Sequence, residues 1–330
     1  MSASGPEQQS METTAQGHGE PVLQDRPQGL LHRVFDSDIW HSFSRSPITV
    51  LSAIVTLMFF LAAIFAPLIA PYTPFQAGSL HLMDGFTPPF EEGMSGNFYV
   101  FGTDDQGRDV FSAIIYGARI SLLVGFCAVL FAMVLGVTLG LIAGYRGGWI
   151  DTVIMRIADV QLSFPAILVA LLIFGLAKAM IPRDYQDHMA IYVLIISIGL
   201  SDWVQYARTV RGTTMVEKNR EYVQAARVIG VRPFTILFRH VLPNVMGSVL
   251  VIATIGLALA IIAEATLSFL GVGVPPTTPS LGTLIRIGND FLFSGEWWIT
   301  IFPGIALVML ALSVNLLGDW LRDALNPKLR

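Results

Sequence analysis

Long runs of apolar residues dominate this chain and constrain its fold more than any other feature of the sequence. Most of them reach the roughly 20 residues that a helix needs to cross about 30 Å of hydrocarbon. The six runs are 48–70, 120–143, 157–176, 189–204, 245–270 and 298–317. Hydrophobic residues make up 53% of the chain and charged residues only 13%, which is about half the charged share of a soluble domain. The sequence therefore predicts an all-α membrane protein with six transmembrane helices.

The positions of Lys and Arg indicate the orientation of these spans. If both termini lie on one side, fifteen of the 20 basic residues fall on that side and five on the other. Cytoplasmic segments carry the excess of Lys and Arg in membrane proteins. The run 189–204 is short, but without it the basic segment 208–244 would move to the opposite side. We therefore retain it as the fourth span and expect both termini in the cytoplasm, with 208–244 as a cytoplasmic loop between the fourth and fifth spans.

The segments outside the spans are assigned from composition and capping signals. Residues 1–29 are polar and acidic, as in a disordered tail, and no signal peptide is expected at the start. The pattern over 30–47 predicts a helix lying at the membrane surface, and 48–330 forms the transmembrane domain. An external loop covers 71–101. A capping box formed by Thr103 and Gln106 predicts an interfacial helix over 103–117.

Small residues recur every four positions in the second run, a spacing that lets helix backbones approach closely in lipid. They are Gly117, Ser121 and Gly125, followed by Ala132, Gly136, Gly140 and Gly144. We expect tight helix packing along this stripe.

Charged residues inside or beside the spans need partners. Asp151, Arg156, Asp159 and Gln161 at the start of the third run are expected to snorkel or to pair at the surface, before a break at Pro165. Glu264 is the only acidic residue placed well inside a run, and such carboxylates face a cavity or a partner instead of lipid. Two roles stay open for it, a structural hydrogen bond or a contact on a translocation path or gate, with Ser268 one turn further along its face.

A charged, helix-forming segment, 219–244, lies between the fourth and fifth runs. Asn219 can cap its first helix, Gly230 suits the end of that helix, and Pro233 can open a second one. One face of the first helix would hold Tyr222, Ala225, Ala226 and Ile229. A helix of small residues held at the cytoplasmic surface is expected to dock a soluble partner.

Patterns typical of catalysis and of metal binding are absent from the sequence. No His-Glu-x-x-His, Gly-x-Ser-x-Gly or paired-Asp arrangement occurs in the spans, and no phosphate-binding Gly-rich loop with Lys occurs. The single cysteine, Cys127, allows no disulfide or Cys-based metal framework. His81, Met83 and Met94 are poor metal ligands as a set. We expect no enzyme activity, no cofactor or metal in this chain, and no nucleic-acid partner.

The basic segment resembles the "EAA" loop of bacterial ATP-binding-cassette importer permeases, whose pattern is Glu-Ala-Ala, three residues, Gly, and Leu-Pro near the end. Here the pattern reads Gln224-Ala225-Ala226, Gly230 and Leu242-Pro243. Gln224 replaces the usual Glu, and His240 replaces the usual Ile. Three further stretches resemble the dipeptide and oligopeptide branch of these permeases: GTDDQGRDVFSAIIYGARISL, EATLSFLGVGVPPTTPSLGTLI and NLLGDWLRDALNPKL. The resemblance covers roughly 38–330, apart from 74–99.

The resemblance implies a permease subunit of an ATP-driven, binding-protein-dependent importer in a bacterial inner membrane. Implied partners are a second homologous permease, two subunits that bind ATP and Mg, and a periplasmic or extracellular substrate-binding protein. The basic segment would be the coupling loop, with the coupling residues Glu221, Tyr222, Gln224, Ala225, Ala226, Arg227 and Gly230. Di- or oligopeptides are the expected substrate, and nickel and glutathione remain alternatives within the family. An ATP-independent secondary transporter is the alternative outside it.

Overall fold

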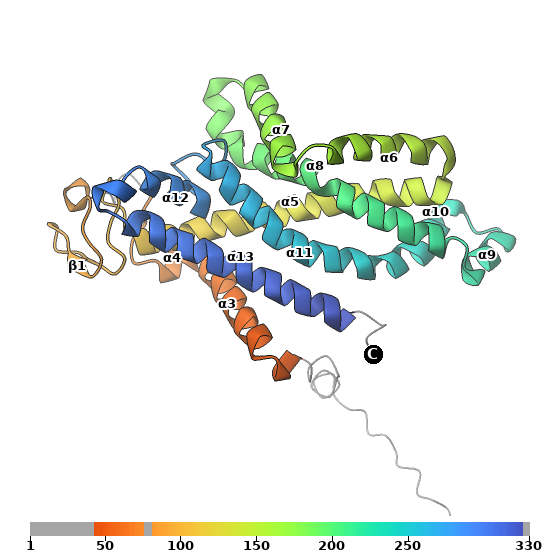
Figure 1. Cartoon of the computed structure of the whole chain (residues 1–330), viewed down its shortest axis with the longest axis horizontal. Coiled ribbons are helices and arrows are strands. Elements are labelled where there is room, and N and C mark those ends of the chain that lie inside the picture. Colours follow the sequence, from red (N-terminus) through yellow and green to blue (C-terminus); the bar gives the residue numbers. More distant parts are fainter. Residues whose placement is uncertain (1–42, 76–80, 326–330) are drawn as a thin grey trace, which may run out of the picture. The chain divides into compact units, whose positions relative to one another are not determined.

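Helices make up most of the described protein (Figure 1). The computed structural model describes residues 43–75 and 81–325. Within them, five helices are long and apolar enough to cross a membrane. They are α3 (Pro47–Ile64), α5 (Val110–Arg146), α8 (Arg183–Glu217), α11 (Leu242–Phe269) and α13 (Trp298–Leu325). A bent pair, α6 (Gly148–Leu162) and α7 (Ala166–Met180), passes the same test together and makes a sixth crossing if it counts as one span.

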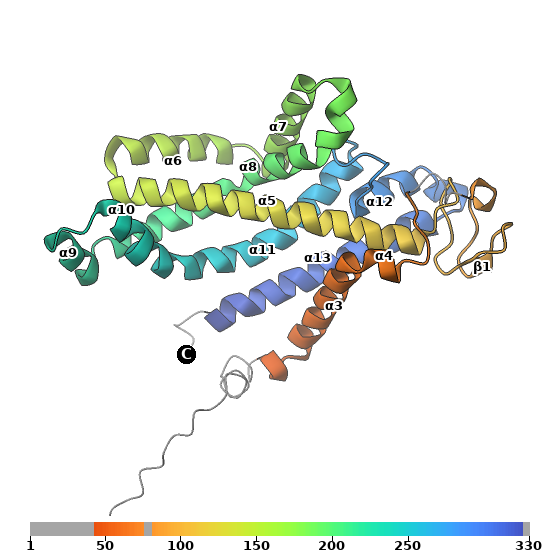
Figure 2. The same cartoon turned by 180° about the vertical axis from the view of Figure 1, so that it is seen from behind.

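The packing of α5 on α8 shows that the bent pair has to return the chain across the membrane. The two helices lie side by side (Figure 2). A Cβ at Gly140 would lie 2.5 Å from the carbonyl oxygen of Ala207, and one at Gly144 would lie 2.8 Å from that of Arg211. Because the contacts advance by four residues on both helices, α5 and α8 run in the same direction. The six-span prediction, including the short fourth run, is therefore confirmed.

Polar contacts fasten α6 to α8 in antiparallel orientation. Asp151 forms an ion pair with Arg211, with one of its hydrogen bonds at 2.6 Å, and Asp159 pairs with Arg208. The side-chain amide of Gln161 donates to two backbone carbonyls of α8. The chain then turns at Pro165, and α7 leaves α6 at 98°. The predicted surface pairing of the two aspartates and the break at the proline are both found.

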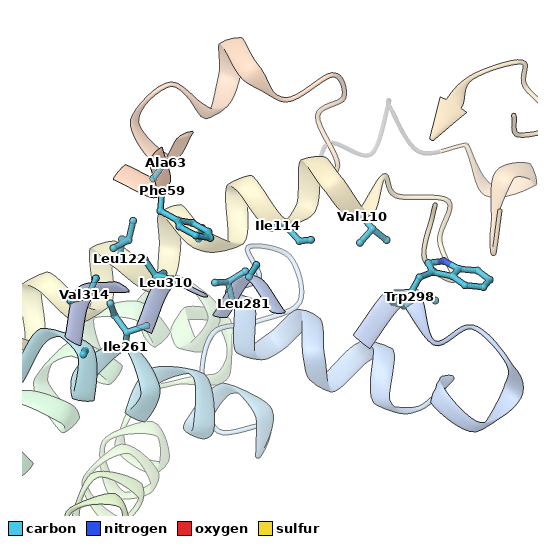
Figure 3. Close-up of a cluster of buried hydrophobic side chains, with 14 residues drawn as sticks. Phe59, Ala63, Val110, Ile114, Leu122, Ile261, Leu281, Trp298, Leu310 and Val314 are labelled. Atoms are coloured by element: carbon cyan, nitrogen blue, oxygen red, sulfur yellow. The ribbon is translucent and has the colours of Figure 1, made fainter. Parts of the chain in front are cut away.

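A hydrophobic cluster joins four of the long helices (Figure 3). It includes Phe59 of α3, Ile114 and Leu122 of α5, Ile261 of α11 and Leu310 of α13. Leu281 of the short helix α12 packs into the same cluster. The short elements are α4 (Ala66–Ile69), η2 (Leu82–Asp84), β1 (Glu91–Glu92), β2 (Phe98–Tyr99), α9 (Glu221–Val228), α10 (Pro233–Thr235), the π-helical turn η3 (Ile236–Val241), α12 (Leu281–Asn289) and η4 (Leu292–Ser294).

The external segment between α4 and α5 folds around one buried carboxylate. Asp84 accepts hydrogen bonds from the backbone N–H of Ser95 and the hydroxyl of Tyr99, each at 2.8 Å. Burial raises the pKa of Asp84, but the hydrogen bonds from Ser95 and Tyr99 outweigh it, so this pKa lies below its usual value. The hydroxyl of Thr103 donates to the Asp84 carbonyl at 2.5 Å, and the Trp298 indole donates to the Thr103 carbonyl at 3.0 Å. The loop, expected to be irregular, is thus built from specific contacts and is tied to α13.

The predicted interfacial helix over 103–117 starts later than expected, at Val110, and leads directly into the second span as part of α5 (Val110–Arg146). The first residues of that range form a tight loop, and α5 begins after it and continues without a break. Asp109 is the N-cap, and its carboxylate accepts from the backbone N–H of Ser112 at 2.9 Å. Asp104, expected in the first helical turn, instead forms a 2.5 Å ion pair with Arg108. This local pairing competes with the capping box, which is why the helix starts later.

The predicted segments at the N-terminus fall mostly outside the described residues, and the predicted loop 208–244 begins within a helix. The tail 1–29 lies outside the described residues, and so does most of the predicted surface helix 30–47. The first part of the predicted loop 208–244 is a continuation of α8, which ends at Glu217.

Candidate functional site: the basic loop and the buried carboxylate

The first helix of the basic loop, α9, starts without a side-chain cap. Arg220 is its N-cap residue and makes no capping hydrogen bond with its side chain. Asn219, predicted to be the cap, donates from its side-chain amide to the Met215 carbonyl at 3.1 Å. Because α8 ends immediately before it, the Asn219 side chain is used to close α8, and that capping prediction is wrong.

The face of α9 that packs on the protein differs from the predicted one. Val223 and Ala226 are its buried residues, and they join a cluster with Tyr206 and Val210 of α8. Ala226 is only 6% exposed, so it cannot lie on a docking face with Ala225. Sequence periodicity found the helix but assigned Ala226 to the wrong side, because it does not tell which apolar stripe faces the membrane domain.

The outward face of α9 contains most of the other predicted coupling residues. Glu221, Gln224, Ala225 and Arg227 are exposed. Val228 and Ile229 follow them with exposed fractions of 87% and 77%. An exposed surface that mixes apolar and charged side chains beside a membrane domain fits a contact with another protein.

Tyr222 lies at the edge of this face and fixes α9 to its flanks. Its hydroxyl donates to the Glu217 carboxylate at 2.7 Å and accepts from the Asn244 amide at 3.0 Å. Burial and the bond to Glu217 raise the pKa of Tyr222 above its usual value. The residue expected to anchor a partner therefore also links the end of α8 to the start of α11.

Gly230 ends α9 in the left-handed conformation, with φ at +80°. Its N–H donates to the Arg227 carbonyl at 3.1 Å, and the N–H of Val231 donates to the Ala226 carbonyl at 3.0 Å. This pair of bonds is a Schellman motif, in which glycine is favoured because it lacks a Cβ. A helix end at Gly230 and a second helix opening at Pro233 are found as predicted.

Two contacts missed by the sequence reasoning attach the loop to α5. The Lys218 ammonium donates to the Gly144 carbonyl at 2.7 Å. The Arg227 guanidinium lies over the ring of Tyr145, 5.4 Å from its centroid. Neither residue type signals such a contact in the sequence. These contacts join α5 to the end of α8 and to α9.

Glu264 lies near the opposite end of α11 and is fully buried. Its carboxylate accepts from Ser121 at 2.6 Å and from Ser268 at 2.7 Å. The two hydroxyls in turn accept from the backbone N–H groups of Leu281, at 3.3 Å, and Val274, at 3.4 Å. These bonds support the structural alternative for Glu264. The sequence marked Ser121 only as a small residue of the packing stripe and did not identify it as this partner.

Two of the residues considered as metal ligands are methionines in the segment between α4 and α5. Met83 and Met94 are exposed on the external segment. The described part of the chain contains no group of three or more His, Cys, Asp or Glu side chains placed to hold a metal ion.

Comparison with known proteins identifies the family. Residues 136–330 match the model of the binding-protein-dependent transport system inner membrane component. The chain belongs to this family. Residues 36–89 also match the N-terminal transmembrane domain of oligopeptide transport permease C. Both matches agree with the resemblance found in the sequence.

Several curated relatives cover most of the chain. It is 38% identical to the dipeptide transport system permease protein DppC of Haemophilus influenzae, over 93% of this chain and 100% of that protein. It is 36% identical to DppC of Bacillus subtilis, over 90% of this chain and 87% of the relative. The glutathione transport system permease protein GsiD of Pectobacterium atrosepticum is also 38% identical, over 94% and 95% of the two chains.

A solved structure shares the fold. An inward-facing conformation of the MetNI methionine ABC transporter matches 66% of this chain and 97% of its own, with a TM-score of 0.52 and 19% identity. The protein is a multi-pass inner-membrane permease subunit of the ABC importer class.

Proposed function

We propose that this permease imports di- or oligopeptides, driven by ATP that separate partner subunits hydrolyse. The observation that carries the proposal is the match to peptide permeases along nearly the whole chain, including all of the Haemophilus influenzae relative. In this proposal the chain forms half of the translocation path, and a second homologous permease forms the other half. ATP and Mg belong to the ATPase subunits, and an external binding protein delivers the substrate.

The outward face of α9 is the proposed docking site for an ATPase subunit. Support comes from the exposed Gln224, Ala225 and Val228 on a helix whose other side is buried and packed against η3. Glu221, Tyr222, Arg227 and Gly230 complete the coupling site in this proposal. Ala226 contributes by holding α9 in place, since its side chain is buried.

Alternating access is the proposed transport mechanism. Two contacts support it: Arg227 connects α9 to Tyr145 at the end of α5, and Lys218, the C-cap of α8, connects α8 to Gly144 of α5. When two such docking helices approach each other on ATP binding, the long helices would follow as rigid bodies. The concentration of Lys and Arg at this end supports a cytoplasmic location for the loop and for both termini.

A glutathione importer is the second candidate, because GsiD is as similar to this chain as DppC of Haemophilus influenzae is. Glutathione is itself a tripeptide, so the two candidates differ in side-chain and linkage recognition rather than in chemical class. Nickel import is supported by family membership alone. An ATP-independent secondary transporter is disfavoured, because such proteins place several ionisable groups near the bilayer midplane, whereas Glu264 is buried and hydrogen-bonded to serines.

Uptake of labelled substrates tests the proposal. Cells that express the complete transporter, and cells that lack only this chain, are supplied with a labelled dipeptide, labelled glutathione or labelled nickel. We expect dipeptide uptake that requires this chain. Chain-dependent uptake of glutathione or nickel without dipeptide uptake would overturn the substrate assignment.

A further inference from the structure

A groove of about 570 Å³ opens beside the basic loop, between the last turns of α5 and the segment formed by α10 and η3. Its walls are mostly apolar. Leu141 and Ile142 line it from α5, and Phe234 and Phe238 line it from the opposite side. Phe234 is 71% exposed. Mostly apolar clefts of this size with a few polar groups are typical of small-molecule binding sites.

Two guanidinium groups line the loop end of the groove. Arg146 is the last residue of α5, and Arg232 immediately precedes α10. Both residues are exposed. Among the described residues, neither has an acidic side chain within ion-pair distance. The site therefore offers two unneutralised cations to an anion, and guanidinium groups bind phosphate through paired N–H donors.

The length of the groove along α5 indicates which kind of ligand its apolar part can bind. Its lining extends along α5 from Arg146 back to Thr138, about 12 Å along the helix at 1.5 Å per residue. A surface that starts at the basic membrane end and continues this far into a transmembrane helix reaches hydrocarbon. A soluble ATPase would not reach Thr138, whereas an acyl chain anchored by its headgroup at Arg146 would.

We propose that this groove binds one anionic phospholipid, with its phosphate at Arg146 and Arg232 and an acyl chain along Ile142 and Phe238. Basic pockets between helices at the cytoplasmic side of a membrane bind anionic headgroups in this manner. The proposal rests on the proposed function in one respect, the placement of this membrane end in the cytoplasm. Tyr145 lines the same groove and lies under Arg227 of α9. A bound lipid would therefore brace the docking helix from the membrane side.

Lipid retention on the purified full chain tests this site. Wild type, R146Q/R232Q and the control R156Q are placed in nanodiscs of equal parts phosphatidylglycerol and phosphatidylcholine, and retained lipids are counted by native mass spectrometry. Arg156 is exposed on α6, carries the same charge and does not line the groove. We expect wild type and R156Q to retain one more phosphatidylglycerol per chain than R146Q/R232Q. Loss of both cations should weaken binding about 30-fold.

The folding of the variants is controlled separately. R146K/R232K keeps both charges and should retain the lipid, and equal thermal unfolding in phosphatidylcholine alone shows that each variant is folded. The same count of phosphatidylglycerol on wild type and R146Q/R232Q would overturn the proposal. Displacement of the lipid by excess inorganic phosphate would also overturn it, because the groove would then be an anion site without acyl-chain recognition.

In the last measurement, retained lipids are counted on the assembled transporter. If the isolated chain retains the lipid but the complete complex does not, a partner helix occupies the groove and the proposal is wrong. The lipid count on the isolated chain does not depend on ATPase docking. Failure of docking would therefore overturn the proposed function and leave this measurement interpretable.

Discussion

The hydroxyl of Ser121 in α5 donates a 2.6 Å hydrogen bond to the carboxylate of Glu264 in α11. The two residues are 143 positions apart in the sequence, and both are fully buried. Because Ser121 also accepts from the backbone of Leu281, this single contact joins two long helices to the start of α12. It ties together the end of the helix bundle that lies opposite the basic loop.

Replacement of Glu264 should measure the strength of this junction. Glu264→Ala leaves the hydroxyls of Ser121 and Ser268 without their acceptor, at a cost of about 1–3 kcal/mol. Glu264→Gln keeps one acceptor oxygen and should therefore lose less stability than Glu264→Ala. Thermal unfolding of the purified chain compares the two variants. If Glu264→Ala unfolds at the wild-type temperature while transport is lost, the residue acts on the translocation path and not as a structural junction.

The seam between α5 and α8 offers a matched pair of glycine substitutions. In Gly140→Ala the added Cβ would lie 2.5 Å from the Ala207 carbonyl oxygen, whereas Gly212 has nothing within 4 Å of such an atom. We expect Gly140→Ala to destabilise the protein by about 1–3 kcal/mol through overpacking. Gly212→Ala should be neutral or slightly stabilising, because alanine is the better helix former. Equal unfolding temperatures would show that the helices are not packed as described.

Gly230→Asp tests the coupling loop. Residue 230 has φ at +80°, where a side chain costs about 1–2 kcal/mol, and the aspartate adds a charge at the proposed docking face. Membrane insertion should be unchanged, while transport and substrate-stimulated ATP hydrolysis are lost. Gly148→Asp is the control, since Gly148 also has a positive φ and open surroundings but lies outside the loop. If Gly230→Asp transports substrate at the wild-type rate, the loop does not couple transport to ATP hydrolysis.

The external segment should open in acid in a manner that depends on Asp84. Because its folded pKa is below the usual 3.8, its stabilising contribution is complete above that value and disappears as pH falls through the folded pKa. Burial raises the pKa of Asp104 and Asp109. Those two groups therefore favour the folded state more as pH falls, which opposes the effect of Asp84. Pepsin digestion above and below pH 3.8 should cut the wild-type segment only at the lower pH.

Asp84→Asn should be cut at both pH values, because an amide nitrogen cannot accept the bonds that Ser95 and Tyr99 donate. Glu91→Gln, an exposed substitution in β1 of the same segment, should behave as wild type. Cleavage of Asp84→Asn only at the lower pH would contradict the role of the buried carboxylate.

The sequence predicted the features that depend on repeated local patterns. Six apolar runs identified the crossings, and the stripe ending at Gly144 predicted tight helix packing, which is found against α8 in its C-terminal part without the partner helix having been predicted. Gly230 and Pro233 were correct as helix boundaries, since positive φ and a fixed first turn are properties of single residue types. The packing of the seam, with α5 and α8 in the same direction, also supports the short fourth run.

Features set by tertiary contacts could not be predicted. One apolar stripe of α9 was assigned to the partner, although Ala226 is buried in a cluster inside the protein. The start of α5 was misplaced because Arg108 takes the carboxylate of Asp104. The pairing of Ser121 with Glu264 connects residues that no local pattern relates. The 98° turn after α6 depends on polar contacts with α8 as well as on Pro165.

Crosslinking from α9 tests the central claim, that this helix docks an ATPase subunit. With Cys127 replaced by Ala, single cysteines are placed at Ala225, which is exposed, and at the neighbouring Ala226, which is buried. After mild-detergent purification of the tagged transporter, we predict that Ala225→Cys crosslinks to an ATPase subunit and that Ala226→Cys crosslinks little. A preparation with no ATPase subunit and no crosslink from either position, in which the chain still moves solute in liposomes, would contradict the account.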